Sequence, residues 1–421
     1  MNNKLRILVV LPMYGGSLPI GEYCAKALSR LGHSVRVFSA QNLYPGYLGI
    51  RKLDIAPARA REVEHSFLKF VNQAIWAQIQ EQKPSLVLAL AQAPIDALTL
   101  RKLKREGVAS VMWFVEDYKV FNYWKTLAPL YDAFAVIQKQ PFLDMLKDIG
   151  QERALYLPLA ALPEFHKPLK LNPAELKEYG SELSFLGAGY PNRRLAFRGL
   201  ADRDFKIWGN DWDNETALAK NIQRGGARIS AEESVKIYNA AGININLHSS
   251  LDASSIAGGG DFVNPRTFEL AAIGAFQLTD RRSLTDELFA DDELALFDSM
   301  DEFYQKLDYF SAHPEKRAEY AAKGRERVLK SHTYELRMET LLDYLRKNIP
   351  GFGKELVADN LPEDLPPELA EKIPGLASDL GLAPDARFED IVAALRREQG
   401  ELTELETAIL FLDEWRKQYS R

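Results

Sequence analysis

Short apolar runs alternate with longer amphipathic segments along the first half of the chain. Continuous apolar runs of about five residues are typical of strands buried on both faces of a parallel sheet, and apolar residues spaced three or four apart predict helices. The predicted strands are 7–11, 35–39, 86–90, 108–115 and 133–137, and the predicted helices are 19–31, 67–80 and 95–105. This alternation predicts βαβ units and therefore a parallel α/β sheet.

The alternation stops and then begins again. Pro163, Pro168 and Pro173 interrupt the pattern between residues 159 and 179 and predict a linker. Beyond the linker, apolar strands are predicted at 183–186, 205–208, 243–247 and 275–278, and helices at 302–310, 314–329 and 334–347. We therefore expect a second doubly wound domain.

The composition changes after Pro350, where prolines become frequent before helical spacing returns at 388–398 and 402–419. The predicted organisation is a first domain at 1–160, a linker at 161–180, a second domain at 181–348 and a helical appendage at 349–421. Apolar residues between Ala393 and Trp415 can form one helical face. Packing on the main body, a homo-oligomer contact and a platform for a protein acceptor are all open readings of that face.

Length and charge narrow the class of protein. A chain of 421 residues and 47.6 kDa suits two or three domains. Its net charge of −6 differs from the positive charge expected of a protein that binds nucleic acid over a broad surface. The single cysteine, Cys24, excludes an intramolecular disulfide and a cysteine-based zinc site. No apolar run approaches the ~20 residues of a membrane helix, and the apolar stretch near the start is too short for a signal peptide. We expect a cytoplasmic protein with no integral membrane segment.

Ligands of open parallel sheets bind beyond the carboxyl ends of the strands, so the loops after predicted strands are the first place to search. Tyr14, Gly15 and Gly16 follow the first strand, where glycines let a ligand approach the backbone at a helix N-terminus. Glu116 and Asp117 follow the strand at 108–115, where a carboxylate can hold or deprotonate an acceptor hydroxyl. The alternatives are a tight turn for the glycines and a solvated acid or helix cap for the carboxylates.

The first loop of the second domain combines glycines with arginines. Gly187, Gly189 and Tyr190 precede a helix start, and Arg193 and Arg194 lie in its first turn. Backbone N–H groups and guanidinium groups together suit a diphosphate. We expect at least one of the two arginines to bind an anion, while the other can simply face solvent.

Two further strand ends carry weaker signals. Trp208 and Gly209 can flank a nucleotide base, or the tryptophan can pack beside a turn. His248 follows the strand at 243–247 and either reaches the cleft or is a satisfied buried histidine. Asp211 and Asp213 have the spacing of a metal-binding dyad but stand beside the predicted base pocket, so we predict no metal site.

The most informative segment is a triple glycine, 258–260, that leads into a helix beginning near Pro265. Arg266 lies in the first turn of this helix, and Glu269 is three residues later on the same face. A cation and a carboxylate placed in this way can hold a phosphate and sugar hydroxyls. The alternative is an intrahelical Arg–Glu pair, worth only about 0.3 kcal/mol.

Together these motifs resemble GT-B glycosyltransferases of the group 1 type. The resemblance is closer to the CgeB-like, spore-maturation-type branch, which includes bacterial protein and flagellin glycosyltransferases, and it extends over about residues 5–348. Its strongest motif is Asn264-Pro265-Arg266-Thr267-Phe268-Glu269 with Ala272 and Gly274, supported by Gly187-Ala188-Gly189-Tyr190-x-x-Arg193, Asn244-Ile245-Asn246-Leu247-His248 and His332-Thr333-Tyr334.

The resemblance implies a GT-B fold, in which two Rossmann-like domains face a cleft, the first binding the acceptor and the second the nucleotide-sugar. It implies that Glu269 holds the ribose hydroxyls, and that Arg266 with Arg193 or Arg194 holds the pyrophosphate. Seven residues separate Asp261 from Glu269, so that Asp261 stands where the family has the first acid of an E-x7-E pattern. The catalytic candidates are Asp117, Asp261 and Glu269. The other donor-side candidates are Gly187, Gly189, Tyr190, Trp208, Gly209, His248, Asn264, Thr267 and Phe268, and the acceptor-side candidates are Tyr14, Gly15, Gly16 and Glu116.

The function expected from the resemblance is a retaining glycosyltransferase that needs neither metal nor cofactor. It would move a sugar from a nucleotide donor, with UDP- or dTDP-sugars favoured, to a protein acceptor such as flagellin or to a glycan. A sugar-nucleotide epimerase or hydrolase is one alternative, and a catalytically inactive subunit that binds a sugar nucleotide is another.

Overall fold

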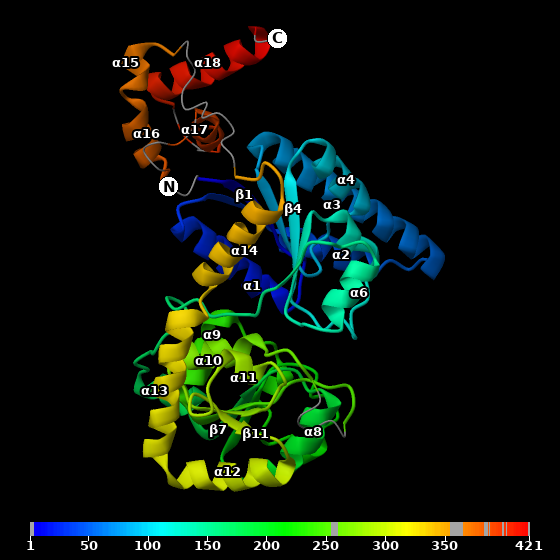
Figure 1. Cartoon of the computed structure of the whole chain (residues 1–421), viewed down its shortest axis with the longest axis vertical. Coiled ribbons are helices and arrows are strands. Elements are labelled where there is room, and N and C mark those ends of the chain that lie inside the picture. The colour runs from blue at the N-terminus through cyan, green and yellow to red at the C-terminus, as the bar shows by residue number, and fades with distance from the viewer. Residues whose placement is uncertain are drawn as a thin grey trace. The chain divides into compact units, whose positions relative to one another are not determined.

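The computed structural model describes residues 4–253, 260–353, 365–382, 386, 388–397, 400 and 402–419. The chain divides into two compact units, Lys4–Phe352 and a smaller unit that contains Gly353–Arg421. Figure 1 labels the elements of both units, which we describe one at a time.

The larger unit contains two parallel sheets. The first has the strand order β2-β1-β3-β4-β5-β6 and consists of β1 (Arg6–Val10), β2 (Ser34–Phe38), β3 (Leu86–Leu90), β4 (Ala109–Phe114), β5 (Ala133–Val136) and β6 (Ala154–Tyr156). The second has the order β11-β10-β9-β7-β8 and consists of β7 (Ser181–Leu186), β8 (Phe205–Trp208), β9 (Ala241–Asn246), β10 (Gln277–Asp280) and β11 (Ala295–Phe297). The predicted α/β, doubly wound architecture is confirmed.

Helices connect the strands within each sheet. In the first domain they are α1 (Ser17–Arg30), α2 (Tyr44–Ile50), α3 (Pro57–Gln82), α4 (Ala97–Arg105), α5 (Trp124–Leu127) and α6 (Phe142–Asp148). In the second they are α7 (Pro173–Tyr179), α8 (Pro191–Phe197), α9 (Ala231–Ala240), α10 (Pro265–Ile273), α11 (Thr285–Leu288), α12 (Met300–Ala312) and α13 (Pro314–Ser331), and α14 (Tyr334–Asn348) follows. Short 3-10 helices lie at Ala40–Leu43, Ala128–Leu130, Arg198–Leu200, Thr216–Leu218 and Gln223–Gly226.

Strand β1 is buried on both faces of the sheet, which explains its continuous apolar sequence. Ile7 and Val9 point to one face of the sheet, where they pack against α1 and α14. Leu8 and Val10 point to the other face, where they pack against α3 and α4. A strand covered by helices on both faces needs an apolar residue at every position.

Both sheets change winding direction next to their first strand. In the first sheet β1 lies between β2 and β3, and in the second β7 lies between β8 and β9. Each order corresponds to the 2-1-3-4-5 arrangement of flavodoxin-like folds, which leaves a crevice beyond the carboxyl ends of the first and third strands. The loops after β7 and β9 therefore meet at one place, as do the loops after β1 and β3.

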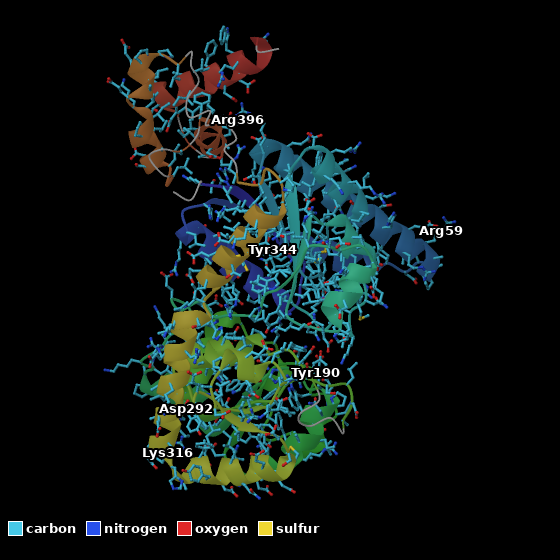
Figure 2. All side chains as sticks on the ribbon, viewed as in Figure 1. Arg59, Tyr190, Asp292, Lys316, Tyr344 and Arg396 are labelled. Carbon is cyan, nitrogen blue, oxygen red and sulfur yellow. The ribbon has the colours of Figure 1, made fainter. Side chains whose placement is uncertain are left out.

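Helix α14 returns to the first domain although it follows the second along the chain. Met338 and Leu341 join the hydrophobic core that contains α1. The hydroxyl of Tyr344, labelled in Figure 2, donates to the carbonyl of Ala154 at 3.3 Å. The guanidinium of Arg337 donates to the carbonyl of Pro158 at 2.7 Å. The sequence pattern places residues 334–347 in the second domain, because amphipathic spacing predicts a helix but does not identify the sheet that it covers.

Other elements also differ from the prediction. Strands β6 and β11 were not predicted, because three residues are too short for a clear apolar run. Strand β10 begins two residues later than predicted. Helix α7 occupies the end of the predicted linker, where Pro173 is a helix start and Asn172 forms a capping box with Glu175.

The smaller unit is helical, as predicted, with α15 (Pro367–Ala370), α16 (Ile373–Asp379), α17 (Phe388–Leu395) and α18 (Glu404–Tyr419). Its own hydrophobic core includes Ile373, Leu376, Phe388, Ile391 and Ile409. Over the part of the chain that the structure describes, no helix has the length and apolar character needed to cross a membrane.

Candidate functional site

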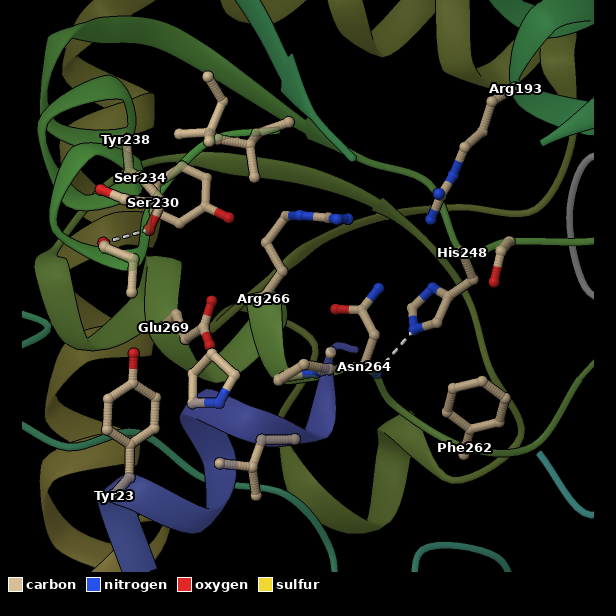
Figure 3. Close-up of a pocket in the computed structure, with 18 residues that line it drawn as sticks. Tyr23, Arg193, Ser230, Ser234, Tyr238, His248, Phe262, Asn264, Arg266 and Glu269 are labelled. Carbon is tan, nitrogen blue, oxygen red and sulfur yellow. Dashed lines mark hydrogen bonds between the residues drawn. The ribbon is translucent and has the colours of Figure 1, made fainter. Parts of the chain in front are cut away.

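A cavity of about 230 Å³ lies at the point where the second sheet changes winding direction. Its walls come from Leu186 at the end of β7, Arg193 of α8, residues 248, 249 and 262 after β9, the first turns of α10, and α9 with the residues before it. Gly16, Ile20 and Tyr23 of the first domain complete the lining. Figure 3 shows Tyr23 on one side and Arg193 and His248 on the other, with Arg266 and Glu269 between them.

Asn264 begins helix α10 and directs its N-terminus toward the cavity. The Asn264 Oδ1 accepts from the N–H of Thr267 at 3.1 Å, which caps the helix. The Asn264 Nδ2 donates to Asn246 Oδ1 at 2.9 Å, and this bond joins the helix to the end of β9. The predicted helix start at Pro265 is confirmed.

Arg266 extends from this first turn into the cavity. Its Nη1 donates to Asn246 Oδ1 at 3.1 Å, while its buried Nε has no hydrogen-bond partner. The guanidinium lies 5.2 Å from the centre of the Phe185 ring. A Cβ at Gly187 would come within 2.9 Å of Arg266 Nη2, so a side chain there would displace the guanidinium. Arg266 is thus held in place with hydrogen-bonding capacity to spare.

Arg193 is the second cation of the cavity and is only 5% exposed. Its Nε and Nη2 donate to the carbonyl of Leu247 at 3.0 and 2.8 Å, and its Nη1 donates to the carbonyl of Ala188 at 3.0 Å. Burial and the charge of Arg266 lower its pKa to about 9, so it remains charged at neutral pH. Among the described residues, no carboxylate lies within 4.0 Å of either guanidinium, an arrangement that suits a bound anion.

Arg194 has a different role from its neighbour. Its Nε donates to the carbonyl of Gly189 at 2.7 Å, and its Nη1 donates to the carbonyl of Asp213 at 2.7 Å. Its Nη2 donates to the carbonyl of Asp211. Arg194 ties two loops together and does not line the cavity, so Arg193 is the member of the pair that faces it.

Glu269 lies one turn after Arg266 and lines the same cavity. Its side chain is 17% exposed, and no hydrogen bond from another described residue reaches its carboxylate; His166 Nε2 lies 3.9 Å from its Oε1. Burial raises the pKa of Glu269 to about 7, against the opposing effect of Arg266. No ion pair within 4.0 Å joins the two side chains, so the intrahelical pair considered above does not form. Both groups are available to a ligand.

His248 lines the cavity but its ring nitrogens are occupied. Its Nε2 accepts from the N–H of Asn264 at 2.9 Å, and its Nδ1 therefore donates to Asp280 Oδ1 at 2.7 Å. Asp280 is also paired with Arg282 at 3.3 Å. Burial lowers the pKa of His248, which agrees with a neutral ring. The structure therefore shows a satisfied buried histidine that joins Asn264, at the start of α10, to Asp280, at the end of β10.

The acids Asp117 and Asp261 meet at one amide, although they belong to different domains. Gln138 Nε2 donates to Asp261 Oδ1 at 2.9 Å and to Asp117 Oδ1 at 3.3 Å. The Gln138 Oε1 accepts from the N–H of Tyr118 at 3.0 Å. Sequence reasoning missed Gln138, although it directly follows the predicted strand at 133–137 and the strand-end rule could have found it.

Glu116 lies in a separate cluster outside the cavity. Its Oε2 accepts from the hydroxyl of Tyr123 at 2.8 Å, and its Oε1 accepts from Gln92. Burial raises the pKa of Glu116. These contacts fix the carboxylate inside the first domain, so it does not point toward Arg266 or Glu269.

The loop after β1 approaches the cavity through its glycines. Gly16 lines the cavity, and the carbonyl of Gly15 accepts from Arg228 Nη2 of the second domain at 3.1 Å. Gly15 has φ +104°, which favours glycine. Tyr14 is 50% exposed and stacks on Tyr44 with ring centres 4.9 Å apart.

Several donor-side candidates do not line the cavity. Trp208 packs with Tyr179 and Ile237 in a buried cluster, and Phe268 packs against Phe289. Thr267 is buried and accepts from Asn246 Nδ2 at 2.8 Å. These side chains support the walls of the site, because a residue at the end of a strand or in the first turn of a helix can face the core as readily as the crevice.

The remaining candidates are close to the backbone of the same loops. A Cβ at Gly209 would come within 2.7 Å of the carbonyl of Gly187, and a Cβ at Gly189 within 2.1 Å of the carbonyl of Asp211. Tyr190 is 37% exposed, and Arg193 lies 5.3 Å from its ring centre. The glycines therefore let two loops pack closely rather than contacting the cavity.

Part of the predicted glycine loop cannot be compared with the structure. Gly258 and Gly259 of the triple glycine lie outside the described residues. Within the described ranges, no group of three or more His, Cys, Asp or Glu side chains could hold a metal ion.

Comparisons with known sequences bear on the same region. Residues 193–343 match a family model described as glycosyl transferase-like. Spore protein CgeB of Bacillus subtilis (strain 168) is 25% identical over 270 residues, which make up 61% of this chain and 82% of that protein.

Solved structures share the fold. A glycosyltransferase from Rickettsia africae ESF-5 has a TM-score of 0.56 at 14% identity, covering 83% of this chain and 100% of that one. Sucrose-phosphate synthase from Thermosynechococcus elongatus has a TM-score of 0.56 at 13% identity, covering 82% and 99%. Anabaena HepE, in complex with UDP and glucose, has a TM-score of 0.54 at 12% identity, covering 82% and 100%.

The fold and the sequence matches together define a glycosyltransferase of the GT-B class. Within that class the sequence matches are to a glycosyl transferase-like family model and to CgeB, so the resemblance seen in the sequence motifs is confirmed.

Proposed function

We propose that this glycosyltransferase binds a nucleoside diphosphate sugar in the cavity between α10 and α1 and transfers the sugar to a protein or glycan acceptor. The observation that carries the proposal is the arrangement of Glu269, Arg193 and Arg266. One buried carboxylate and two guanidinium groups line a single cavity without pairing to one another.

The two arginines suit the diphosphate. When the glycosidic bond of the donor breaks, negative charge develops on the leaving diphosphate, and fixed cations stabilise that charge. Arg266 Nε has no partner, and the N-terminus of α10 adds the partial positive charge of its backbone N–H groups. These groups supply the stabilisation that a metal ion provides in other transferases, so we propose a reaction without metal or cofactor.

Glu269 suits the ribose. A carboxylate accepts hydrogen bonds from two neighbouring hydroxyl groups, and no described side chain donates to this one. HepE, which shares the fold, binds UDP and glucose, and this supports a UDP- or dTDP-linked donor here.

The acceptor would approach from the first domain. Asp117 and Asp261 converge on Gln138 from the two sides, where they can hold the acceptor hydroxyl and the donor sugar respectively. We propose retention of the anomeric configuration, as the family resemblance implies. The anomeric signal of the product in a proton NMR spectrum tests this step directly.

Thermal stabilisation by UDP, dTDP, GDP and ADP tests the donor site. A nucleotide at about 100 times its dissociation constant adds ~2.7 kcal/mol of stability. We expect one nucleotide to stabilise the wild type but not Glu269→Ala.

Glu293→Ala is the matched control, because Glu293 is a partly buried glutamate of the same domain that pairs with Arg327 at 2.8 Å, outside the cavity lining. This variant should lose stability yet respond to nucleotide as the wild type does. Equal stabilisation of wild type and Glu269→Ala would refute the site assignment.

A further inference from the structure

His166 lies directly behind Glu269, in the segment that connects the two domains. The Leu162 N–H donates to His166 Nδ1 at 3.0 Å, and the His166 N–H donates to the Leu162 carbonyl at 2.8 Å. Because Nδ1 accepts a hydrogen bond, the ring proton is on Nε2. That Nε2 lies 3.9 Å from Glu269 Oε1.

The His166 ring has little freedom to move. It is 2% exposed, and the rings of Tyr23 and Phe165 pack edge-on against it at 5.0 and 5.1 Å. Burial lowers the pKa of His166 to about 3, so the ring is neutral at physiological pH. The result is a rigid, uncharged N–H donor aimed at the carboxylate.

Other groups also face Glu269. Arg266 comes from the same helix and is the cation among them. Tyr23 on α1, Tyr238 on α9 and Tyr334 on α14 contribute neutral hydroxyls from three more elements. Apart from Arg266, the groups that face the carboxylate are therefore uncharged, and one additional hydrogen-bond donor has a large effect on its ionisation.

We propose that His166 is a positioning residue for Glu269: with nucleotide bound, its Nε2–H donates to the carboxylate and holds it ionised and oriented toward two sugar hydroxyls. The distance of 3.9 Å exceeds hydrogen-bonding distance by about 1 Å, and a small side-chain shift of Glu269 closes that gap. The inference rests on the proposed function, since it requires a nucleotide at Glu269. It makes the connecting segment part of the donor site.

The pH dependence of nucleotide binding distinguishes this role from a purely structural one. Glu269 is ionised above a pKa of about 7 in the free protein, so binding that needs the carboxylate should weaken up to about tenfold per pH unit below that value. Loss of the His166 donor should raise the pKa of Glu269 in the nucleotide complex, where the hydrogen bond forms, and so shift the midpoint of the binding profile to higher pH.

Two substitutions distinguish the role of His166 Nδ1 from that of His166 Nε2. In His166→Asn the amide replaces Nδ1 and preserves the contact to the Leu162 N–H, but it does not reach Glu269. In His166→Gln the longer amide can donate from the position of Nε2. His33→Asn is the control, because His33 is buried and its Nδ1 accepts from the Leu5 N–H at 3.2 Å, far from the cavity lining.

The experiment is calorimetric titration of the full chain, between pH 6 and pH 9, with whichever of UDP, dTDP, GDP or ADP stabilises the wild type most. We expect His166→Asn to bind about tenfold more weakly at pH 8 with its midpoint shifted upward, and His166→Gln to remain within about threefold of the wild type. His33→Asn should lose stability but keep the wild-type profile. If His166→Asn does not fold, His166→Ala takes its place in the series.

The outcomes distinguish a failure of this inference from a failure of the proposed function. Unchanged affinity and midpoint in the His166 variants, alongside lost binding in Glu269→Ala, would overturn the inference alone. Absence of binding to the wild type, or full binding to Glu269→Ala, would overturn the proposed function and this inference with it.

Discussion

At the scale of single residues, the site is defined by charges that the protein leaves unpaired. A buried ion normally has a partner of opposite charge, because desolvation is costly. Arg193 and Glu269 are both largely buried, yet no described side chain forms an ion pair with Arg193, and among the described basic side chains only the neutral His166 lies within 4.0 Å of the Glu269 carboxylate. A ligand that supplies an anion to Arg193 and hydrogen-bond donors to Glu269 lowers the free energy of both buried charges. Such a ligand therefore binds at this cavity in preference to other surfaces.

Arg193→Lys should reduce the preference for a diphosphate. Lysine keeps the charge but loses the planar contacts to Leu247 and Ala188, so the ammonium no longer holds the position of the guanidinium. We expect nucleoside diphosphate binding to weaken about 10- to 100-fold, while binding of the corresponding nucleoside stays within about twofold. Calorimetry with both ligands measures the difference.

Arg194→Met is the matched control for this substitution. Arg194 holds the loops at Gly189 and Asp213 outside the cavity lining, so its loss should lower the melting temperature and leave the diphosphate preference intact. A loss of diphosphate preference in Arg194→Met equal to that in Arg193→Lys would contradict the assignment of Arg193.

At the scale of elements, helix α10 aligns the binding groups through its first turn. The Asn264 side chain caps the helix and joins it to Asn246, and Asn246 Oδ1 also accepts from Arg266. A single cap therefore sets both the direction of the helix and the position of a cation in the cavity.

Asn264→Ala should affect stability and binding together. Loss of the cap costs about 1 kcal/mol, and loss of the contact to Asn246 adds about as much. We expect the melting temperature to fall by several degrees and nucleotide affinity to fall about tenfold, because Arg266 loses its alignment.

Asn172→Ala provides the comparison for the cap. Asn172 caps α7 through the N–H groups of Ala174 and Glu175, and it does not line the cavity. This variant should lose similar stability without losing affinity. If both variants keep wild-type affinity, the cap does not position the binding groups.

At the scale of the larger unit, Gln138 joins the two domains where the catalytic candidates meet. Its amide donates to Asp117 of the first domain and to Asp261 of the second. The same face of the first domain contributes Gly16 and Tyr23 to the cavity, so donor binding depends on both domains.

Gln138→Ala should loosen this junction. We expect faster amide hydrogen exchange around residues 260–264 in the free protein, with protection restored by nucleotide, and a transfer rate reduced about tenfold. Gln151→Ala is the control, because Gln151 is a buried glutamine whose Nε2 donates to the carbonyls of Ala128 and Tyr131 and whose Oε1 accepts from the Arg153 N–H, all within the first domain. Identical exchange at 260–264 in wild type and Gln138→Ala would show that this contact does not hold the domains together.

The fold was predictable to the extent that it depends on local patterns. Strand β3 was predicted with its observed bounds, because a run of five consecutive apolar residues is typical of a central strand that helices cover on both faces of a parallel sheet. Helix α3 is longer than predicted, since its first half, up to Phe70, has no buried residue and therefore no apolar periodicity to detect. Helix α14 was predicted as a helix, but its return to the first domain depends on which exposed apolar face it covers.

The sequence by itself determined the order of the elements, the parallel α/β class, and the start of α10 at Asn264 and Pro265, because hydrophobic periodicity and helix capping act over a few neighbouring residues. Only the tertiary structure decided that Arg193 and not Arg194 faces the cavity, that both nitrogens of His248 are occupied, and that His166 approaches Glu269. These outcomes depend on contacts between residues far apart in the chain, and strand order and helix packing, rather than local spacing, bring such residues together.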